Sequence, residues 1–199
     1  MAEDFAVFVD GISSLQQAKD WSRKIELAAV QAINKTADRT RTRSAKQMRE
    51  EVNFSAAYLN PSSGRFNVTR RASGSKLEAV LRGRDRPTSL ARFATSGTVN
   101  REGVRVEVAP GVAKFLPKAF LIRLPAGSGD VQTKSNLALA IRLGPGHSFK
   151  NKKQAIKLKN GLYLLYGPSV NQVFQSVREE QVGDAETYMA QEFTRLVDL

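Results

Sequence analysis

Few side chains in this sequence are suited to catalysis. The 199-residue chain has one histidine and no cysteine, which excludes a multi-histidine metal site, a thiolate nucleophile and a disulfide framework. The histidine, His147, follows Gly144-Pro145-Gly146, a turn sequence that predicts an exposed loop. No serine lies in a Gly-x-Ser-x-Gly elbow.

The acidic residues and glycines of the middle of the chain are also poorly arranged for chemistry. The acids occur singly, without the close spacing that a two-metal nuclease uses; they are Glu78, Asp85, Glu102, Glu107 and Asp130. The glycine pairs at 127/129 and 144/146 lack the Gly-Lys-Ser/Thr ending of a phosphate loop. We therefore expect no enzymatic activity, no metal and no cofactor.

Charge is the most unusual property of the chain. Thirty-one Lys and Arg against nineteen Asp and Glu give a net charge of +12, which predicts attraction to a polyanion, nucleic acid first. The last twenty-five residues contain two basic and six acidic side chains, a net −4, so the remainder carries +16. A basic body with an acidic end can associate with copies of itself.

Two groups of basic residues are candidates for phosphate contact. Arg39, Arg43 and Lys46 fall at i, i+4 and i+7 of a predicted helix, and Lys35 extends this stripe by one turn. The alternative is a solvated helix face. A predicted loop carries the second group, Lys150, Lys152 and Lys153. Phe149 is its only aromatic neighbour, so contact through phosphates is favoured over base stacking.

The stretch from Arg82 to Phe93 allows two interpretations. Its Arg82-Gly83-Arg84 start could clamp a phosphate. The alternative, which we favour, is that Pro87–Phe93 forms a short helix capped by Thr or Ser and anchored by Leu90 and Phe93.

Periodicity predicts an α+β fold: a long N-terminal helix, a central, mostly antiparallel sheet and a C-terminal helix. After a short strand near residues 5–10, the long helix is expected from about Leu15, and Ser55 is expected to cap a second, short helix through Leu59. The strands are predicted at Leu77–Arg82, Val104–Ala109, Phe115–Leu124, Leu137–Leu143 and Leu162–Tyr166. We expect a single domain over residues 1–199, with flexible loops near 61–75 and 144–160.

The closing helix begins after Gly167-Pro168-Ser169 and has a long apolar stripe, with a break or bend expected at Gly183. We expect the stripe to be longer than one subunit can cover, which predicts a subunit interface. Its proposed interface residues are Val177, Tyr188, Met189, Phe193 and Leu196. The alternative is that this helix packs on its own sheet.

The order of these features resembles the minor tail protein Z family of long-tailed bacteriophages and prophages. The resemblance runs from about Ile25 to Phe193. It is carried by four segments: Ala32-Ile33-Asn34-Lys35-Thr36-Ala37, the Arg-rich residues 84–93, the strand Ala119–Leu124, and Leu165-Tyr166-Gly167-Pro168-Ser169-Val170. The acidic C-terminal helix departs from the family pattern.

The resemblance implies a virion protein, made in the host cytoplasm, that completes the head-proximal end of a phage tail near the neck. It further implies a homo-oligomeric ring around the DNA channel, with other tail and neck proteins as partners. The sequence has no run of eighteen apolar residues, so no membrane is expected as a partner. Gly167, Pro168 and Ser169 would then be structural: the glycine permits the turn, the proline fixes φ and the serine hydrogen-bonds helix N–H groups. Two alternatives stay open, a sequence-nonspecific nucleic-acid-binding protein and a phage-encoded hydrolase or nuclease.

Overall fold

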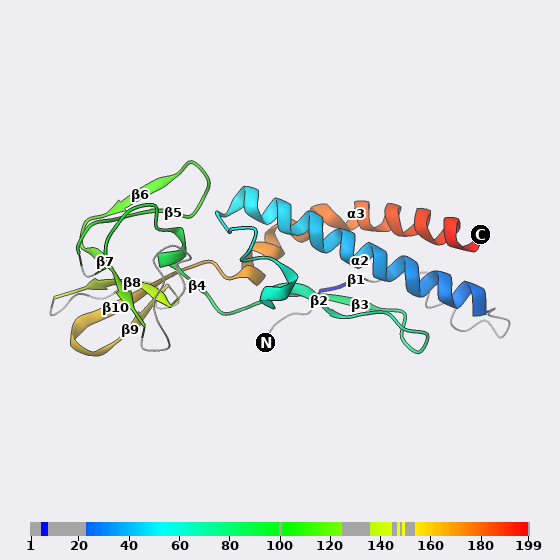
Figure 1. The fold of residues 1–199 in the computed structure, drawn as a ribbon, viewed down its shortest axis with the longest axis horizontal. Coiled ribbons are helices and arrows are strands. Elements are labelled where there is room, and N and C mark those ends of the chain that lie inside the picture. The colour runs from blue at the N-terminus through cyan, green and yellow to red at the C-terminus, as the bar shows by residue number, and fades with distance from the viewer. Residues whose placement is uncertain are drawn as a thin grey trace. The chain divides into compact units, whose positions relative to one another are not determined.

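The computed structural model describes residues 5–7, 23–99, 101–124, 136–144, 147, 149 and 154–198. It confirms the α+β class, with a helix toward each end of the chain and antiparallel strand pairs between them (Figure 1). The chain falls into two compact units. The helical unit comprises Met1–Met48, Ser55–Asp85 and Asn171–Leu199, and the sheet unit comprises Arg49–Phe54 and Arg86–Val170.

The helical unit contains two long helices and a small sheet. Helix α2 spans Arg23–Glu51, and α3 spans Val170–Val197. The sheet has the antiparallel order β1-β3-β2, formed by β1 (Phe5–Val7), β3 (Ala79–Gly83) and β2 (Phe66–Arg70). The long helix was expected to begin at about Leu15, but residues 8–22 lie outside the described residues.

Helix α2 buries a face of small side chains. Ala29, Ala37 and Ser44 are fully buried, and Ile33 and Met48 supply the larger apolar side chains of the same face. These residues recur at steps of four and seven, so they share one side of the helix. Small residues on this face allow neighbouring side chains to approach the α2 backbone closely.

Helix α3 supplies the large side chains of the same core. Phe174 is 1% exposed and its ring centroid lies 4.8 Å from that of Phe66 on β2. Val177 and Met189 are also buried. The helix continues through Gly183, contrary to the break predicted there. A glycine lowers helix propensity by about 1 kcal/mol, which this buried stripe outweighs.

The segment after α2 differs from the prediction. Residues 56–60 form turns in place of the short helix, although the Ser55 side chain accepts a hydrogen bond from the Tyr58 N–H, as a cap would. In place of a flexible loop over 61–75, the chain forms a 3₁₀ helix, Pro61–Ser63, followed by β2. Asn60 caps the 3₁₀ helix by accepting from the Ser62 N–H.

The sheet unit is built around a five-stranded antiparallel sheet. Its order is β4-β10-β8-β7, with β9 also paired to β10. The strands are β4 (Thr88–Ser89), β7 (Ala119–Arg123), β8 (Leu137–Arg142), β9 (Ala155–Lys157) and β10 (Leu162–Gly167). Leu121, Leu139 and Leu165 lie in its core. A 3₁₀ helix, Lys159–Gly161, precedes β10.

A separate hairpin pairs β5 (Val104–Glu107) with β6 (Ala113–Leu116). The predicted strand Phe115–Leu124 is therefore two strands, β6 and β7, which Pro117 and Lys118 separate. Proline lacks the N–H that a central strand requires, which explains the division. The other predicted strands agree with the structure to within a few residues. Across the described ranges, no helix is long and apolar enough to cross a membrane.

Candidate functional site

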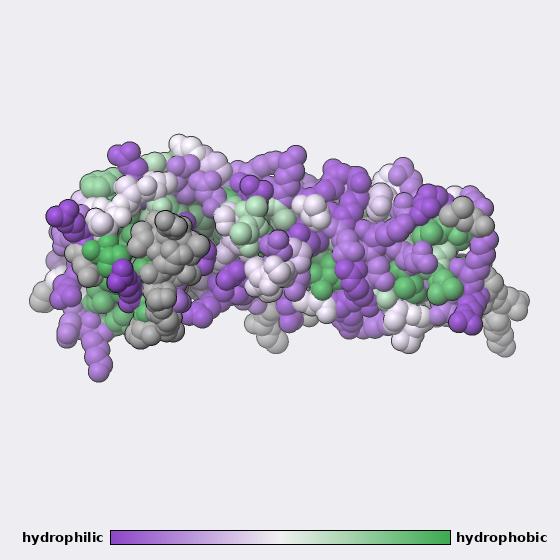
Figure 2. Space-filling view, in the orientation of Figure 1, coloured by the Kyte–Doolittle hydropathy of each residue, from purple (hydrophilic) through white to green (hydrophobic). Residues whose placement is uncertain are grey.

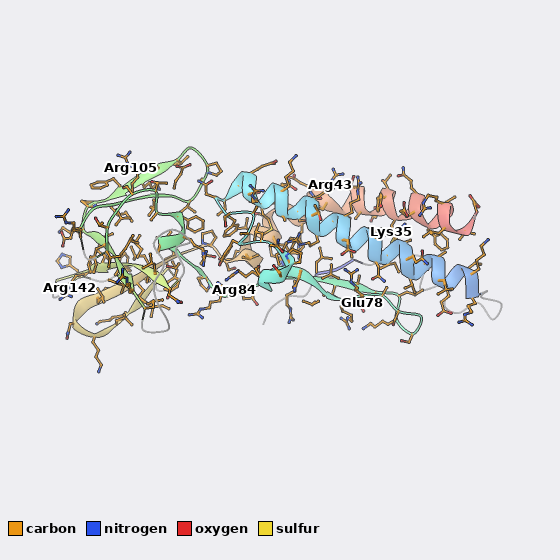
Figure 3. All side chains as sticks on the ribbon, viewed as in Figure 1. Lys35, Arg43, Glu78, Arg84, Arg105 and Arg142 are labelled. Carbon is orange, nitrogen blue, oxygen red and sulfur yellow. The ribbon has the colours of Figure 1, made fainter. Side chains whose placement is uncertain are left out.

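The basic stripe of α2 lies against the acidic residues of α3 in the same chain. The Lys35 Nζ is 3.0 Å from the Glu192 Oε2. Arg39 and Arg43 both pair with Asp184, at 3.4 Å and 2.8 Å. Figure 3 shows Lys35 and Arg43 on α2, with α3 running beside it. The opposite charges of the two ends of the sequence therefore meet within one subunit.

Further contacts continue this row along the two helices. The Arg39 guanidinium lies over the Tyr188 ring, 4.4 Å from its centroid. Toward the other end of the row, Gln47 donates to Glu180 and accepts from the Gln181 side chain. Lys35, Arg39, Arg43 and Gln47 thus follow one face of α2 at four-residue spacing, each meeting α3.

The Glu192 carboxylate of this row lies beside two cations. Hydrogen bonds from Arg195 and Lys35 lower its pKa to about 2. The Arg195 Nη2 lies 2.9 Å and the Lys35 Nζ 3.0 Å from its carboxylate. Glu192 thus stays ionised well below the usual pH range of a glutamate, and it joins the last turns of α3 to the middle of α2.

Three cations of the stripe, Lys35, Arg39 and Arg43, thus meet acids of α3 within the chain. Arg39 and Arg43 share one acid, which neutralises part of their charge. Lys46 is exposed and has no ion pair within the described parts of the chain. This pairing could not be predicted from the sequence, because Arg43 and Asp184 are 141 residues apart along the chain.

The proposed interface residues divide into two groups. Val177 is 0% and Met189 3% exposed within the chain itself, so both are core residues and are not available to a partner. Tyr188, Phe193 and Leu196 are partly buried and remain candidates. Figure 2 shows mostly hydrophilic side chains over α2 and α3, with apolar atoms gathered where α2 begins and α3 ends.

The Gly167-Pro168-Ser169 segment joins strand β10 to helix α3, as predicted. Gly167 does not adopt a positive φ. A Cβ there would lie 3.2 Å from atoms of both Leu90 and Phe93, so the glycine permits close packing. The Pro168 carbonyl accepts a long hydrogen bond from the Thr88 N–H at 3.4 Å, and Ser169 is buried immediately before α3.

The remaining candidates have different outcomes. Lys150, Lys152 and Lys153 lie outside the described residues. His147 is exposed in a turn, with its N–H bonded to the Gly144 carbonyl. The predicted helix near Phe93 is the 3₁₀ helix Leu90–Phe93, capped by Ser89, whose side chain accepts from the Ala91 N–H. Within the described ranges, His, Asp and Glu side chains form no group of three suited to a metal.

One positioning residue in the Ala32–Ala37 motif was not recognised from the sequence. The Asn34 side chain donates to the Ala72 carbonyl at 3.1 Å and accepts from the Ala72 N–H at 2.9 Å. It thus binds both backbone groups of a buried residue that precedes β3. Its neighbours Ala32, Ile33, Thr36 and Ala37 are buried, so this motif serves packing.

No protein-family profile, curated protein or solved structure matches this chain.

Proposed function

We propose that this chain is a structural virion protein that completes the head-proximal end of a long phage tail as a subunit of a ring around the DNA channel. The observation that carries the proposal is the junction at residues 165–170. There β10 ends, Gly167 packs against Leu90 and Phe93, and α3 begins. This strand-to-helix junction and closing helix follow the order of elements on which the family resemblance depends.

The side chains support a structural role over a catalytic one. The residues that carry the resemblance serve packing and backbone positioning, as Asn34 and Gly167 illustrate. The net charge of +12 suits a protein that surrounds DNA, and no chemistry of bases is required for that contact. On this proposal Lys46, Lys150, Lys152 and Lys153 are the lysines that face the channel.

A second candidate function is sequence-nonspecific nucleic-acid binding by the free protein. It is favoured by the net charge of +12, which comes from thirty-one Lys and Arg against nineteen Asp and Glu. The two candidates differ in oligomeric state. A tail-completing subunit is expected to form rings, whereas a free DNA-binding protein is expected to act as a monomer with a steep salt dependence.

Deletion of the coding sequence from its phage or prophage genome tests the proposal. We expect particles with unjoined heads and tails in electron micrographs, and normal particles when the gene is supplied in trans. Electron microscopy and sedimentation of the purified protein should show a closed ring. Infectious particles of normal appearance from the deletion strain would overturn the proposal, and a strictly monomeric protein that binds DNA would favour the second candidate.

A further inference from the structure

Three arginines of the helical unit surround the loop that contains Tyr58. Arg41 on α2 fixes the loop: its Nε donates to the Phe66 carbonyl at 3.2 Å, and its Nη2 donates to the Leu59 carbonyl. The Ser63 hydroxyl donates to the Tyr58 carbonyl at 2.9 Å. Tyr58 is 4% exposed, so its ring is held as a fixed platform.

The other two arginines converge on that ring. Arg65 and Arg84 are neighbours at the end of the β2–β3 pair, where the Arg84 N–H donates to the Arg65 carbonyl at 2.8 Å. The Arg65 guanidinium carbon lies 4.5 Å from the centroid of the Tyr58 ring and that of Arg84 lies 6.0 Å from it. The Arg84 Nη2 also donates to the Tyr58 hydroxyl at 3.0 Å. Figure 3 shows Arg84 just beyond β3.

Among the described residues, this pair of cations has no counter-ion. No carboxylate in the described ranges forms an ion pair with Arg65 or Arg84. The adjacent acid, Asp85, accepts instead from the Asn171 side chain at 2.7 Å. Within the described ranges, the buried Nε atoms of both arginines have no hydrogen-bond acceptor. Two guanidinium groups beside one ring, without an acidic partner in the described ranges, repel each other, and an anion bound to their terminal nitrogens would relieve that repulsion.

We propose that Arg65, Arg84 and Tyr58 form a binding site for a phosphate group of a nucleic-acid backbone. The planar fork of a guanidinium matches two phosphate oxygens, and stacking on Tyr58 fixes its direction in advance. On this proposal the site provides the DNA contact that the proposed function requires. The choice of DNA as the polyanion rests on the proposed function. It also develops the phosphate clamp suggested by Arg82-Gly83-Arg84, with Arg65 in place of Arg82.

Charge favours phosphate over the carboxylate of another subunit. A second copy of this chain would also bring a net charge of +12, and two acids of its α3, Asp184 and Glu192, already have basic partners. A nucleic-acid backbone instead carries a dense row of negative charge and releases counter-ions when it is bound.

The test compares binding of a mixed-sequence DNA duplex by the full chain and its variants over a range of KCl concentrations. The R65Q/R84Q variant should bind more weakly and reduce the salt slope by about 0.9 for each phosphate that the variant no longer binds. R101Q/R105Q is the matched control, because it removes two exposed arginines and the same charge. It should leave the slope nearly unchanged. Thermal melting checks that each variant is folded.

Three further results decide the inference. If R65Q/R84Q does not fold, R65K/R84K replaces it: it keeps the charge but loses the fork, so its duplex affinity should fall more than that of R101K/R105K. Equal effects of the site and control variants on duplex binding would overturn the inference. It would also be overturned if the site variant lost poly-glutamate binding as strongly as duplex binding, because that result would indicate a general anion site. Ring formation is measured separately, so failure of this site leaves the proposed function to its own test.

Discussion

At the scale of single residues, hydrogen bonds to the backbone explain more of this chain than its charged groups do. Asn34 illustrates this, since an asparagine within a helix has no evident purpose in the sequence. Its amide binds both the N–H and the C=O of Ala72. The partner lies 38 residues away, so only the fold reveals the reason for this residue.

The Asn34→Ala substitution should lower the free energy of unfolding by about 1–3 kcal/mol, because it leaves a buried N–H and C=O without partners. Chemical denaturation followed by circular dichroism measures this change. Gln31→Ala is the control, since Gln31 is exposed on the same helix and its replacement should change stability by less than about 0.5 kcal/mol. Equal effects of the two substitutions would show that the Asn34 contacts contribute nothing.

At the scale of elements, the sequence predicted those with strong local patterns and missed those that depend on distant partners. The two long helices, the capped turn at Ser89 and most strands were visible from apolar periodicity and cap residues. Strand β2 was hidden among Ser, Gly and Arg residues, because its pairing with β3 and the contact of Phe66 with Phe174 are non-local. The Pro117 division of one predicted strand was readable in principle from the missing N–H.

Truncation after Gly183 is a prediction at this scale. It removes Asp184, Met189 and Glu192, and with them the ion pairs to Lys35, Arg39 and Arg43. Loss of a buried methionine side chain alone costs about 2–5 kcal/mol, while whole domains are stable by about 5–15 kcal/mol. The truncated chain should therefore lose cooperative unfolding of the helical unit, measured by thermal circular dichroism.

A chain that ends at Val197 is the control for this truncation and should melt like the full protein, because only the last two residues are removed. A truncated chain that remains folded but becomes monomeric would contradict the prediction. That result would restore the view of residues 184–199 as an interface segment.

At the scale of the whole molecule, net charge predicts an affinity for polyanions but not the surface that provides it. The sequence showed a −4 end and a +16 remainder, and complementarity between copies was the natural inference. In the structure the acids of α3 pair with α2 of the same chain. Helical spacing correctly placed Lys35, Arg39 and Arg43 on one face, but spacing within one helix carries no information about which element covers that face.

The last prediction compares Arg39 and Arg43, which pair with Asp184, with Lys46 on the same helix. Replacing Arg39 and Arg43 with Gln should reduce the salt slope of DNA binding by well under two units, because both side chains already interact with Asp184. It should instead weaken the link between α2 and α3, by about 0.2–1 kcal/mol for each exposed pair. Lys46→Gln removes a cation without an acidic partner in the described parts of the chain, so it should reduce the slope by up to about 0.9 without lowering stability. Titrations of one duplex over a range of KCl concentrations, with denaturation curves for the same variants, measure both effects. A slope reduced by about two units in R39Q/R43Q, with unchanged stability, would show that these arginines leave Asp184 and contact phosphates.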